Sequence, residues 1–214
     1  MARIVSIDAR RPDPELLAEA AAHLRLGQLV AMPTETFYGL AADALSETAV
    51  ARVFELKQRP PQRPLPVIVT SVQMLEEIAE LTPLARRLAG EFWPGPLSLI
   101  LAARELVPPS LTGGSGKLAA RVSSHPVAAG LAAAFGGPIT ATSANLSGRP
   151  GLASAPKVDS TLGHGLALIL DGGRAVAHLG STMLDVTVSP PVVVRPGLVP
   201  EELIRRTLAR WRQT

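Results

Sequence analysis

The chain has 214 residues, 47% of them hydrophobic and none of them cysteine, which excludes disulfides, thiolate metal sites and cysteine nucleophiles. Its net charge of +3 and its isoelectric point of about 9.9 favour an anionic partner, whereas an aromatic content of 3% leaves few rings for stacking on single-stranded bases. No segment approaches the roughly 20 apolar residues that span a bilayer, and residues 1–8 lack the long apolar core of a secretory signal, so we expect a cytoplasmic protein without membrane contact.

Helix signals and short apolar runs alternate in the first part of the chain. Asp13, followed by a proline and a helical spacing of apolar residues, predicts the N-cap of a helix that stops at Gly27. Residues 28–32 form a short apolar run, which predicts a buried strand. Ser46 is expected to cap a second helix, which must end before Pro60.

The same alternation continues through the middle of the chain. Residues 64–69 predict a strand whose prolines are confined to its start. Ser71 and Thr82 each offer a further helix start, because both are residues that cap helices well. Further strands are predicted at residues 97–101, 118–122 and 138–141, with a helix over about 126–135 before the last of them.

The last part of the chain predicts three strands and a final helix. The strands are expected at residues 166–170, 183–188 and 192–195, and their close spacing favours antiparallel pairing. Residues 201–212 predict the C-terminal helix. Strands that alternate with helices and then end in a hairpin predict an α/β fold, a mixed open twisted sheet flanked by helices. We expect one domain over residues 1–214, with its core at about 14–200.

Two hydroxyls and a carboxylate directly follow the first predicted strand, at Thr34, Glu35 and Thr36. Ligands of open α/β sheets bind where loops leave the strand ends, and hydroxyls there can bind polar ligand groups. A turn in which Thr34 and Thr36 satisfy local backbone groups explains the pattern equally well.

A basic group stands where the second helix gives way to a loop, at Lys57, Arg59 and Arg63. Phosphate oxygens suit this arrangement, because arginine offers a planar fork and lysine a mobile point charge. A basic helix end is also what the helix dipole favours, and no Walker-type glycine loop accompanies it.

Arg121 is a lone arginine within an apolar stretch. A buried guanidinium needs a partner to offset its desolvation. A substrate carboxylate and an internal Asp or Glu are both open as that partner.

Two later segments are rich in small polar groups. The first runs from Thr142 to Pro150 and offers hydroxyl and amide groups that suit a nucleotide or an amino acid. The second contains Gly180 and Ser181. Arg195 lies 14 residues after Ser181 and can reach a phosphate. Ordinary turn chemistry remains the alternative for both segments.

Other polar residues are assigned to structure rather than to chemistry. The four histidines show no paired metal-ligand spacing and are expected at the surface or at caps: His23, His125, His164 and His178. Residues 113–116 form a glycine-rich run without the lysine of a phosphate loop, so a connector is expected there. Four late arginines are expected on a solvated helix face, with tRNA or partner contact as the alternative: Arg205, Arg206, Arg210 and Arg212.

Seven segments, taken together and in this order, resemble the YrdC/Sua5 family of threonylcarbamoyl-adenylate synthases. They are Pro33 to Leu40, Lys57 to Pro60, Trp93 to Leu97, Arg121, Ser143 to Gly148, Ser181 with Thr182, and Arg195 to Gly197. The similarity runs from about residue 20 to residue 200, and it is to the compact form without an extra C-terminal domain.

The resemblance implies a YrdC-like fold with a basic concave cavity. It implies ATP as a substrate with Mg²⁺ on its phosphates, joined with L-threonine and bicarbonate or CO₂ to give threonylcarbamoyl-AMP and pyrophosphate. Neither a prosthetic group nor a metal ligand from the protein is implied. A separate TsaD-type transferase would pass the product's threonylcarbamoyl group to tRNA, giving threonylcarbamoyladenosine.

The resemblance also assigns residues. Lys57 and Arg59 take the catalytic role, in which clustered cations stabilise the charge that develops in the transition state. The L-threonine site is assigned to Thr34, Arg121, Ala141 and Ser143, with Arg121 on the substrate carboxylate. The ATP site is assigned to Lys57, Arg59, Ser143, Asn145, Ser147, Ser181 and Arg195.

Four positions depart from common family patterns: Ile68, Lys117, Gly151 and Gly180. Two other functions stay open. A non-catalytic RNA-binding module is suggested by the basic isoelectric point and the arginine-rich last helix. A carbamoyl-adenylating domain of the hydrogenase-maturation kind is disfavoured, because the chain has no cysteines for zinc fingers.

Overall fold

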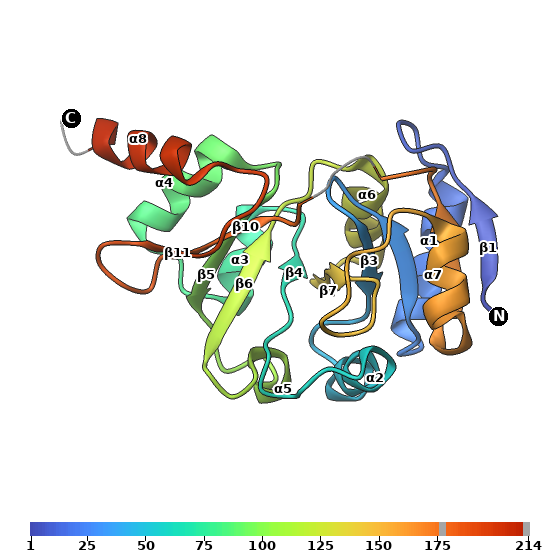
Figure 1. Ribbon diagram of the computed structural model, residues 1–214. Coiled ribbons are helices and arrows are strands. Elements are labelled where there is room, and N and C mark those ends of the chain that lie inside the picture. The colour runs from blue at the N-terminus through green and yellow to red at the C-terminus, as the bar shows by residue number, and fades with distance from the viewer. Residues whose placement is uncertain (176–178, 212–214) are drawn as a thin grey trace.

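The computed structural model describes residues 1–175 and 179–211, in which two mixed β-sheets lie beside each other (Figure 1). The first sheet has five strands in the order β1 (Arg3–Ser6), β9 (Leu168–Asp171), β2 (Val30–Pro33), β3 (Tyr38–Ala41) and β8 (Thr142–Ser143). In it β9 pairs in parallel with β1 and β2, and β3 pairs antiparallel with β2 and β8.

The second sheet has six strands. Their order is β11 (Val192–Arg195), β10 (Thr182–Asp185), β5 (Leu97–Ala102), β6 (Lys117–Arg121), β4 (Val67–Ile68) and β7 (Ile139–Thr140). In this sheet β5 is parallel to β10, and β4 is parallel to β6. The other neighbours are antiparallel.

Helices cover both sheets. They are α1 (Pro14–Arg25), α2 (Glu47–Lys57), α3 (Val72–Ile78), α4 (Pro83–Phe92), α5 (Pro109–Thr112), α6 (Pro126–Phe135), α7 (Ala155–Leu162) and α8 (Glu201–Trp211), with a 3₁₀ turn at Gly163–Gly165. In Figure 1, α1, α6 and α7 surround the five-stranded sheet, and α3, α4 and α8 lie by the six-stranded sheet. The capping side chains predicted for α1 to α4 each accept a hydrogen bond from the first helical turn, namely Asp13, Ser46, Ser71 and Thr82.

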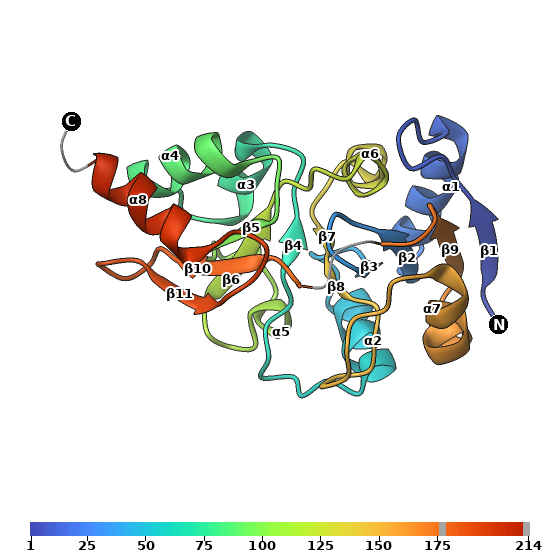
Figure 2. The same ribbon diagram turned by 45° about the horizontal axis from the view of Figure 1, so that its top comes forward.

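A short segment joins the two sheets. β7 pairs with β4 in the six-stranded sheet, and β8, one residue later, pairs with β3 in the five-stranded sheet (Figure 2). The Thr140 N–H donates to the carbonyl of Ala42 at 2.9 Å, and the Ala141 N–H donates to that of Pro66 at 2.8 Å. The chain therefore runs from one sheet into the other at the point where polar side chains begin.

Most of the sequence-based expectations are confirmed, including the α/β class, mixed strand pairing flanked by helices, and the β10–β11 hairpin, although the strands form two sheets where one was expected. The antiparallel pairing of all three late strands is wrong for β9, which lies parallel between β1 and β2. The reason is α7, a helix that had not been expected, because a crossover helix returns the chain in a parallel sense. Strands β1, β3 and β8 and helix α5 were likewise not foreseen.

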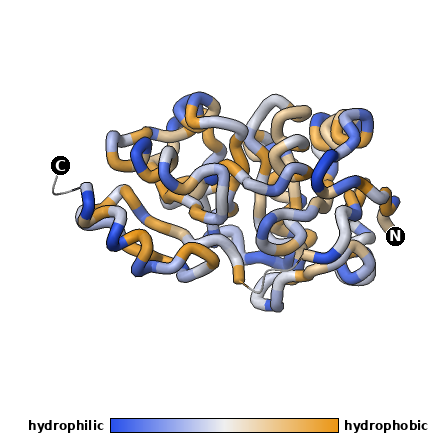
Figure 3. Tube along the Cα trace, turned by 90° about the horizontal axis from the view of Figure 1, so that it is seen from above, coloured by the Kyte–Doolittle hydropathy of each residue, from blue (hydrophilic) through white to orange (hydrophobic). Residues whose placement is uncertain are grey.

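The outer elements carry the polar residues. Hydrophilic and hydrophobic residues alternate along α8 (Figure 3), where Ile204 and Thr207 are buried. Residue 212 of the predicted C-terminal helix lies outside the described residues. No helix in residues 1–175 and 179–211 is long and apolar enough to cross a membrane.

Candidate active site

A cavity of about 480 Å³ opens where the two sheets meet. One wall comes from the turn between β2 and β3 and from the segment that includes β8. The opposite wall comes from β5, β6, β10 and β11. Seven of the residues assigned from the sequence line it: Thr34, Arg59, Arg121, Ala141, Ser143, Ser181 and Arg195. The cavity therefore brings together segments that are up to 161 residues apart, from Thr34 to Arg195.

Arginine dominates the charge of this cavity. Arg59, Arg63, Arg121 and Arg195 line it, and its lining within the described ranges contains no Asp or Glu. Burial lowers the pKa of Arg59, and the charges of Arg63 and Arg195 lower it further. Partial desolvation and the charge of Arg121 likewise lower the pKa of Arg195. Four cations that repel one another across one hollow form a strong site for an anion.

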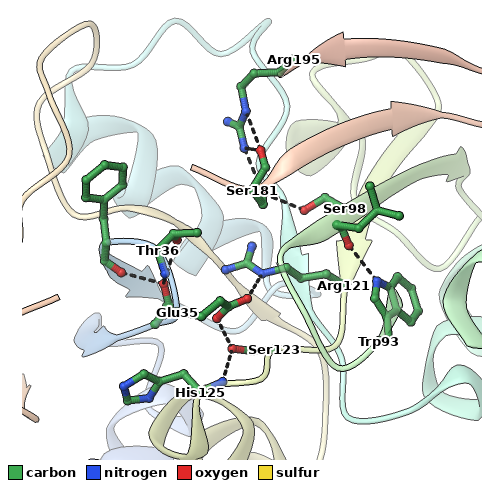
Figure 4. Close-up of polar contacts among 12 residues, drawn as sticks. Glu35, Thr36, Trp93, Ser98, Arg121, Ser123, His125, Ser181 and Arg195 are labelled. Carbon is green, nitrogen blue, oxygen red and sulfur yellow. Dashed lines mark hydrogen bonds and ion pairs between the residues drawn. The ribbon is translucent and has the colours of Figure 1, made fainter. Parts of the chain in front are cut away.

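Arg121 lies at the end of β6 with its side chain 3% exposed. Its Nε donates to Oε1 of Glu35 at 3.0 Å, and the hydroxyl of Ser123 donates to Oε2 of the same carboxylate (Figure 4). The internal acid that the sequence left open as a partner is thus present. The side chain still borders the cavity, so the ion pair does not exclude a substrate carboxylate.

The two threonines of the β2–β3 turn have the local turn role that the sequence allowed, and both also border the cavity. The Thr34 hydroxyl donates to the carbonyl of Phe37 at 2.7 Å and lies 2.9 Å from the Thr36 hydroxyl. Because the Thr34 proton is used in this way, the Thr36 hydroxyl is the donor between them. Both side chains line the cavity and are held rigidly by the turn.

Lys57, Asn145 and Ser147 are not among the residues that line the cavity. The Lys57 side chain is 1% exposed, and its ammonium donates to the backbone carbonyls of Ser143 and Asn145 and to Oδ1 of Asn145. The Asn145 amide donates to the carbonyls of Leu146 and Arg149. These groups stand behind Ser143 and fix the wall that it belongs to.

Arg195 is fixed to the opposite wall. Its Nη2 donates to the carbonyl and the hydroxyl of Ser181 at 2.8 and 3.0 Å, and its Nε donates to the same carbonyl at 3.2 Å. The Ser181 hydroxyl is also 3.0 Å from that of Ser98. This anchoring holds the arginine against the β10 end of the cavity.

Gly197 packs closely against the backbone of residues 180–182, the segment to which Arg195 is anchored. A methyl group there would lie 2.4 Å from the carbonyl oxygen of Gly180 and 2.5 Å from backbone atoms of Ser181 and Thr182. Gly197→Ala is therefore expected to cost about 1–3 kcal/mol, as overpacking does, and to lower the thermal unfolding temperature by several degrees. Gly180→Ala is the control, because its methyl would meet nothing closer than 3.6 Å. Equal unfolding temperatures for the two variants would contradict this interpretation.

Three of the four positions that depart from the family pattern have a described local environment, namely Ile68, Lys117 and Gly151. Ile68 is fully buried and does not line the cavity, whereas Lys117 pairs with Asp185 at 2.9 Å. Gly151 packs against the Phe37 ring, whose nearest atom would be 2.6 Å from an added methyl carbon. The ring therefore occupies the space of a serine side chain.

His125 and three arginines of α8 have structural contacts within residues 1–175 and 179–211. His125 caps α6 by accepting from the Val127 N–H, as expected, whereas His178 lies outside the described residues. In the parts of the chain that the structure describes, no three His, Asp or Glu side chains gather to hold a metal ion. Three arginines of α8 pair with carboxylates: Arg205 with Glu201, Arg206 with Glu202, and Arg210 with Glu91. Arg212 lies beyond the described part of the chain.

Several cavity residues were not found from the sequence. Ile100, Met183 and Val194 form an apolar side opposite the threonines, and Glu35 and Ser123 stand behind Arg121. Strand alternation places the first three on one face or the other, but nothing in the sequence says which face borders a hollow. Glu35 lies within the Pro33 to Leu40 segment, but no role was assigned to it from the sequence.

Fold and site together define an α/β protein with an arginine-lined cavity between two sheets. The chain belongs to the Sua5/YciO/YrdC family, whose model, described as "Telomere recombination", matches residues 22–197. This membership confirms the resemblance found in the sequence.

Individual relatives agree with this assignment. The chain is 44% identical over 194 residues to the threonylcarbamoyl-AMP synthase of Pyrococcus abyssi, covering 90% of this chain but 57% of that protein. It therefore spans little more than half the length of that curated relative. A putative threonylcarbamoyl-AMP synthase of Mycobacterium tuberculosis is 38% identical over 201 residues, with 92% of each chain covered.

Among solved structures, P. abyssi Sua5 complexed with L-threonine superposes on this chain with a TM-score of 0.92 and 42% identity. The match covers 96% of this chain and 60% of that one.

Proposed function

We propose that the chain is a nucleotidyltransferase that forms threonylcarbamoyl-AMP and pyrophosphate from L-threonine, bicarbonate or CO₂, and ATP. The observation that carries the proposal is the convergence of four arginines on one cavity that also has neutral hydroxyl donors. A carboxylate and a triphosphate brought together carry several negative charges, and a cavity lined by cations lowers their repulsion. The names of the relatives support the same reaction.

The threonine end of the cavity is assigned to Arg121, Thr34, Ala141 and Ser143. The terminal nitrogens of Arg121 suit a carboxylate, because a guanidinium donates two parallel hydrogen bonds to it. Thr34 and Ser143 supply neutral groups beside it. The Ala141 N–H already donates to Pro66, so this residue contributes its surface and its carbonyl rather than its N–H.

The nucleotide end is assigned to Arg59, Ser181 and Arg195, to which the structure adds Arg63. In the reaction an oxygen of the threonine carbamate bonds to the α-phosphorus, the bond from that phosphorus to the bridging oxygen breaks, and pyrophosphate leaves with the electron pair. The arginines orient the phosphates and stabilise the charge on the leaving group. Mg²⁺ belongs to the substrate, bound to the phosphates, since no carboxylate lines the described cavity.

The assignment of Lys57, Asn145 and Ser147 to ATP stays a prediction. The three acceptors around the Lys57 ammonium use the three N–H bonds that it has. Its support for catalysis in this proposal is therefore indirect, through the position of Ser143. Arg59, which borders the cavity, is the catalytic cation of the pair.

The surrounding machinery also belongs to the proposal. A TsaD-type transferase is expected to receive the product and to modify tRNA in the cytoplasm, and residues 1–214 are expected to act as one domain. A non-catalytic RNA-binding role is less well supported, because Arg205, Arg206 and Arg210 on α8 pair with carboxylates. No observation favours it over catalysis.

Pyrophosphate release from ATP tests the proposal. Release is expected only when L-threonine, bicarbonate and Mg²⁺ are all present, with little release when any one is omitted. L-serine and L-valine serve as comparison substrates, since each lacks one of the two groups on the threonine Cβ. An equal rate of pyrophosphate release in the absence of L-threonine would overturn the proposal.

A further inference from the structure

One edge of the Arg121 guanidinium is taken by Glu35. The Glu35 carboxylate stands in the turn between β2 and β3 and accepts from Arg121 Nε at 3.0 Å. Its second oxygen accepts from the Ser123 hydroxyl. The Glu35 side chain is 12% exposed and is absent from the residues that line the cavity, whereas Arg121 is among them. Glu35 therefore lies behind the arginine, away from any bound substrate.

The other edge of the guanidinium is free. Within the part of the chain that the structure describes, Nη1 and Nη2 of Arg121 donate to no protein acceptor. Figure 4 shows the tip of the side chain directed toward Thr36, which lines the same cavity. A guanidinium can grip a carboxylate through its two terminal nitrogens or through Nε and one of them. Because Glu35 occupies Nε, the edge formed by the two terminal nitrogens is left for a ligand.

We propose that Glu35 is a positioning residue that sets the orientation of Arg121, so that the substrate carboxylate binds across Nη1 and Nη2. This inference rests on the proposed function, because it names the amino-acid carboxylate as the ligand of Arg121. Glu35 touches neither substrate in this arrangement. It acts by fixing the orientation of the Nη1 and Nη2 edge of the Arg121 guanidinium.

Glu35 is itself held from a second element. The Ser123 hydroxyl that donates to Glu35 also accepts from the His125 N–H at 3.2 Å, and His125 caps α6. Burial lowers the pKa of His125, while the nearby Glu35 charge opposes this shift. The orientation of Arg121 is therefore fixed by two loops, one after β2 and one after β6.

Removing the charge of Glu35 is expected to have opposite effects on two kinds of ligand. The carboxylate offsets the charge of Arg121, which acts on Arg195 in the same cavity. Removing the carboxylate charge makes the cavity more positive, which favours any small anion that needs no particular orientation. The same change frees the guanidinium to rotate, which weakens the binding of a ligand that needs Arg121 in one orientation.

The test is Glu35→Gln, which keeps the size of the side chain and removes its charge. The KM for L-threonine is expected to rise roughly 10- to 100-fold, because a displacement of about 1 Å has effects of that size, with the KM for ATP nearly unchanged. Calorimetric binding of inorganic phosphate should be unchanged or tighter, and that of L-threonine weaker. Ser123→Ala should shift the KM for L-threonine in the same direction by less.

Asp185→Asn is the matched control. It removes a carboxylate that pairs with Lys117 in the same sheet but does not line the cavity, and it should leave both affinities unaltered. An unchanged KM for L-threonine in Glu35→Gln would overturn the inference. So would a loss of both threonine and phosphate binding, since that result marks a purely structural role. If the unmodified chain bound no L-threonine, the proposed function would fall as well.

Discussion

Replacing Arg121 by alanine is expected to raise the KM for L-threonine about 30-fold or more, because removing one side of a buried, hydrogen-bonded charge pair costs about 2–5 kcal/mol. Arg121 is the arginine that the proposal places on the substrate carboxylate, and its side chain is 3% exposed. The KM for ATP should change far less. Steady-state pyrophosphate release, with each substrate varied in turn, measures both constants.

The same substitution leaves the Glu35 carboxylate without its cation, so a loss of stability must be separated from a loss of binding. A buried charge left unpaired costs about 3–5 kcal/mol. The double variant Arg121→Ala with Glu35→Gln removes that charge and should recover much of the stability, but not the threonine affinity. Arg86→Ala, at an exposed ion pair with Glu76, is the surface control. Recovery of threonine affinity in the double variant would refute the assignment.

Lys57→Met is expected to lower kcat by about 100-fold without abolishing folding. The reason is that a displacement of about 1 Å in the cavity wall that carries Ser143 has an effect of that size. The substitution removes the donor that serves the carbonyls of Ser143 and Asn145. Methionine fills a similar volume, but the buried acceptors on Ser143 and Asn145 lose their donor, so we also expect a loss of stability of about 1–3 kcal/mol. Lys157→Met, on the exposed face of α7, is the control. A fully active variant would show that Lys57 does not position the wall.

The Lys57 prediction has a pH signature. Burial, with a smaller contribution from the charge of Arg59, lowers the pKa of Lys57 from 10.5 to about 7. Between these two values the unfolded chain binds the proton and the folded chain does not, so this group makes the free energy of unfolding rise with pH. Below pH 7 both states hold the proton and the contribution is constant. Denaturant unfolding from pH 7 to 9 should show a steeper rise for the unmodified chain than for Lys57→Met.

Much of the fold could be predicted because its signals are local. Asp13, Ser46, Ser71 and Thr82 each began a helix as expected, since a capping side chain needs only the next three residues. Strand partners depend on distant segments instead. β9 joined β1 and β2 rather than the neighbouring hairpin, and nothing within residues 166–170 encodes that choice.

The convergence of Arg59, Arg121 and Arg195 on one cavity could be expected from the ordered motifs taken together rather than from any single motif. Arg59, Arg121 and Arg195 were each ambiguous alone, and their meeting around one cavity depends on β6 and β11 lying in the same sheet. The sequence could not distinguish the residues that border the cavity from the residues that support them from behind. The contact of Lys57 with ATP stays a prediction, and its ammonium donates to the carbonyl of Ser143, whereas Glu35 had no role and stands next to Arg121.

Mass spectrometry of the product tests the central claim most directly, because it reports whether the cavity joins an amino acid to the innermost phosphorus of a nucleotide. The chain would be incubated with MgATP, L-threonine and ¹³C-labelled bicarbonate, and the nucleotides analysed at once. We predict threonylcarbamoyl-AMP that carries one ¹³C atom, together with pyrophosphate, and at least about 30-fold less of this product from Arg121→Ala at low L-threonine. A nucleotide product without the label, or pyrophosphate formed alongside AMP alone, would contradict the account.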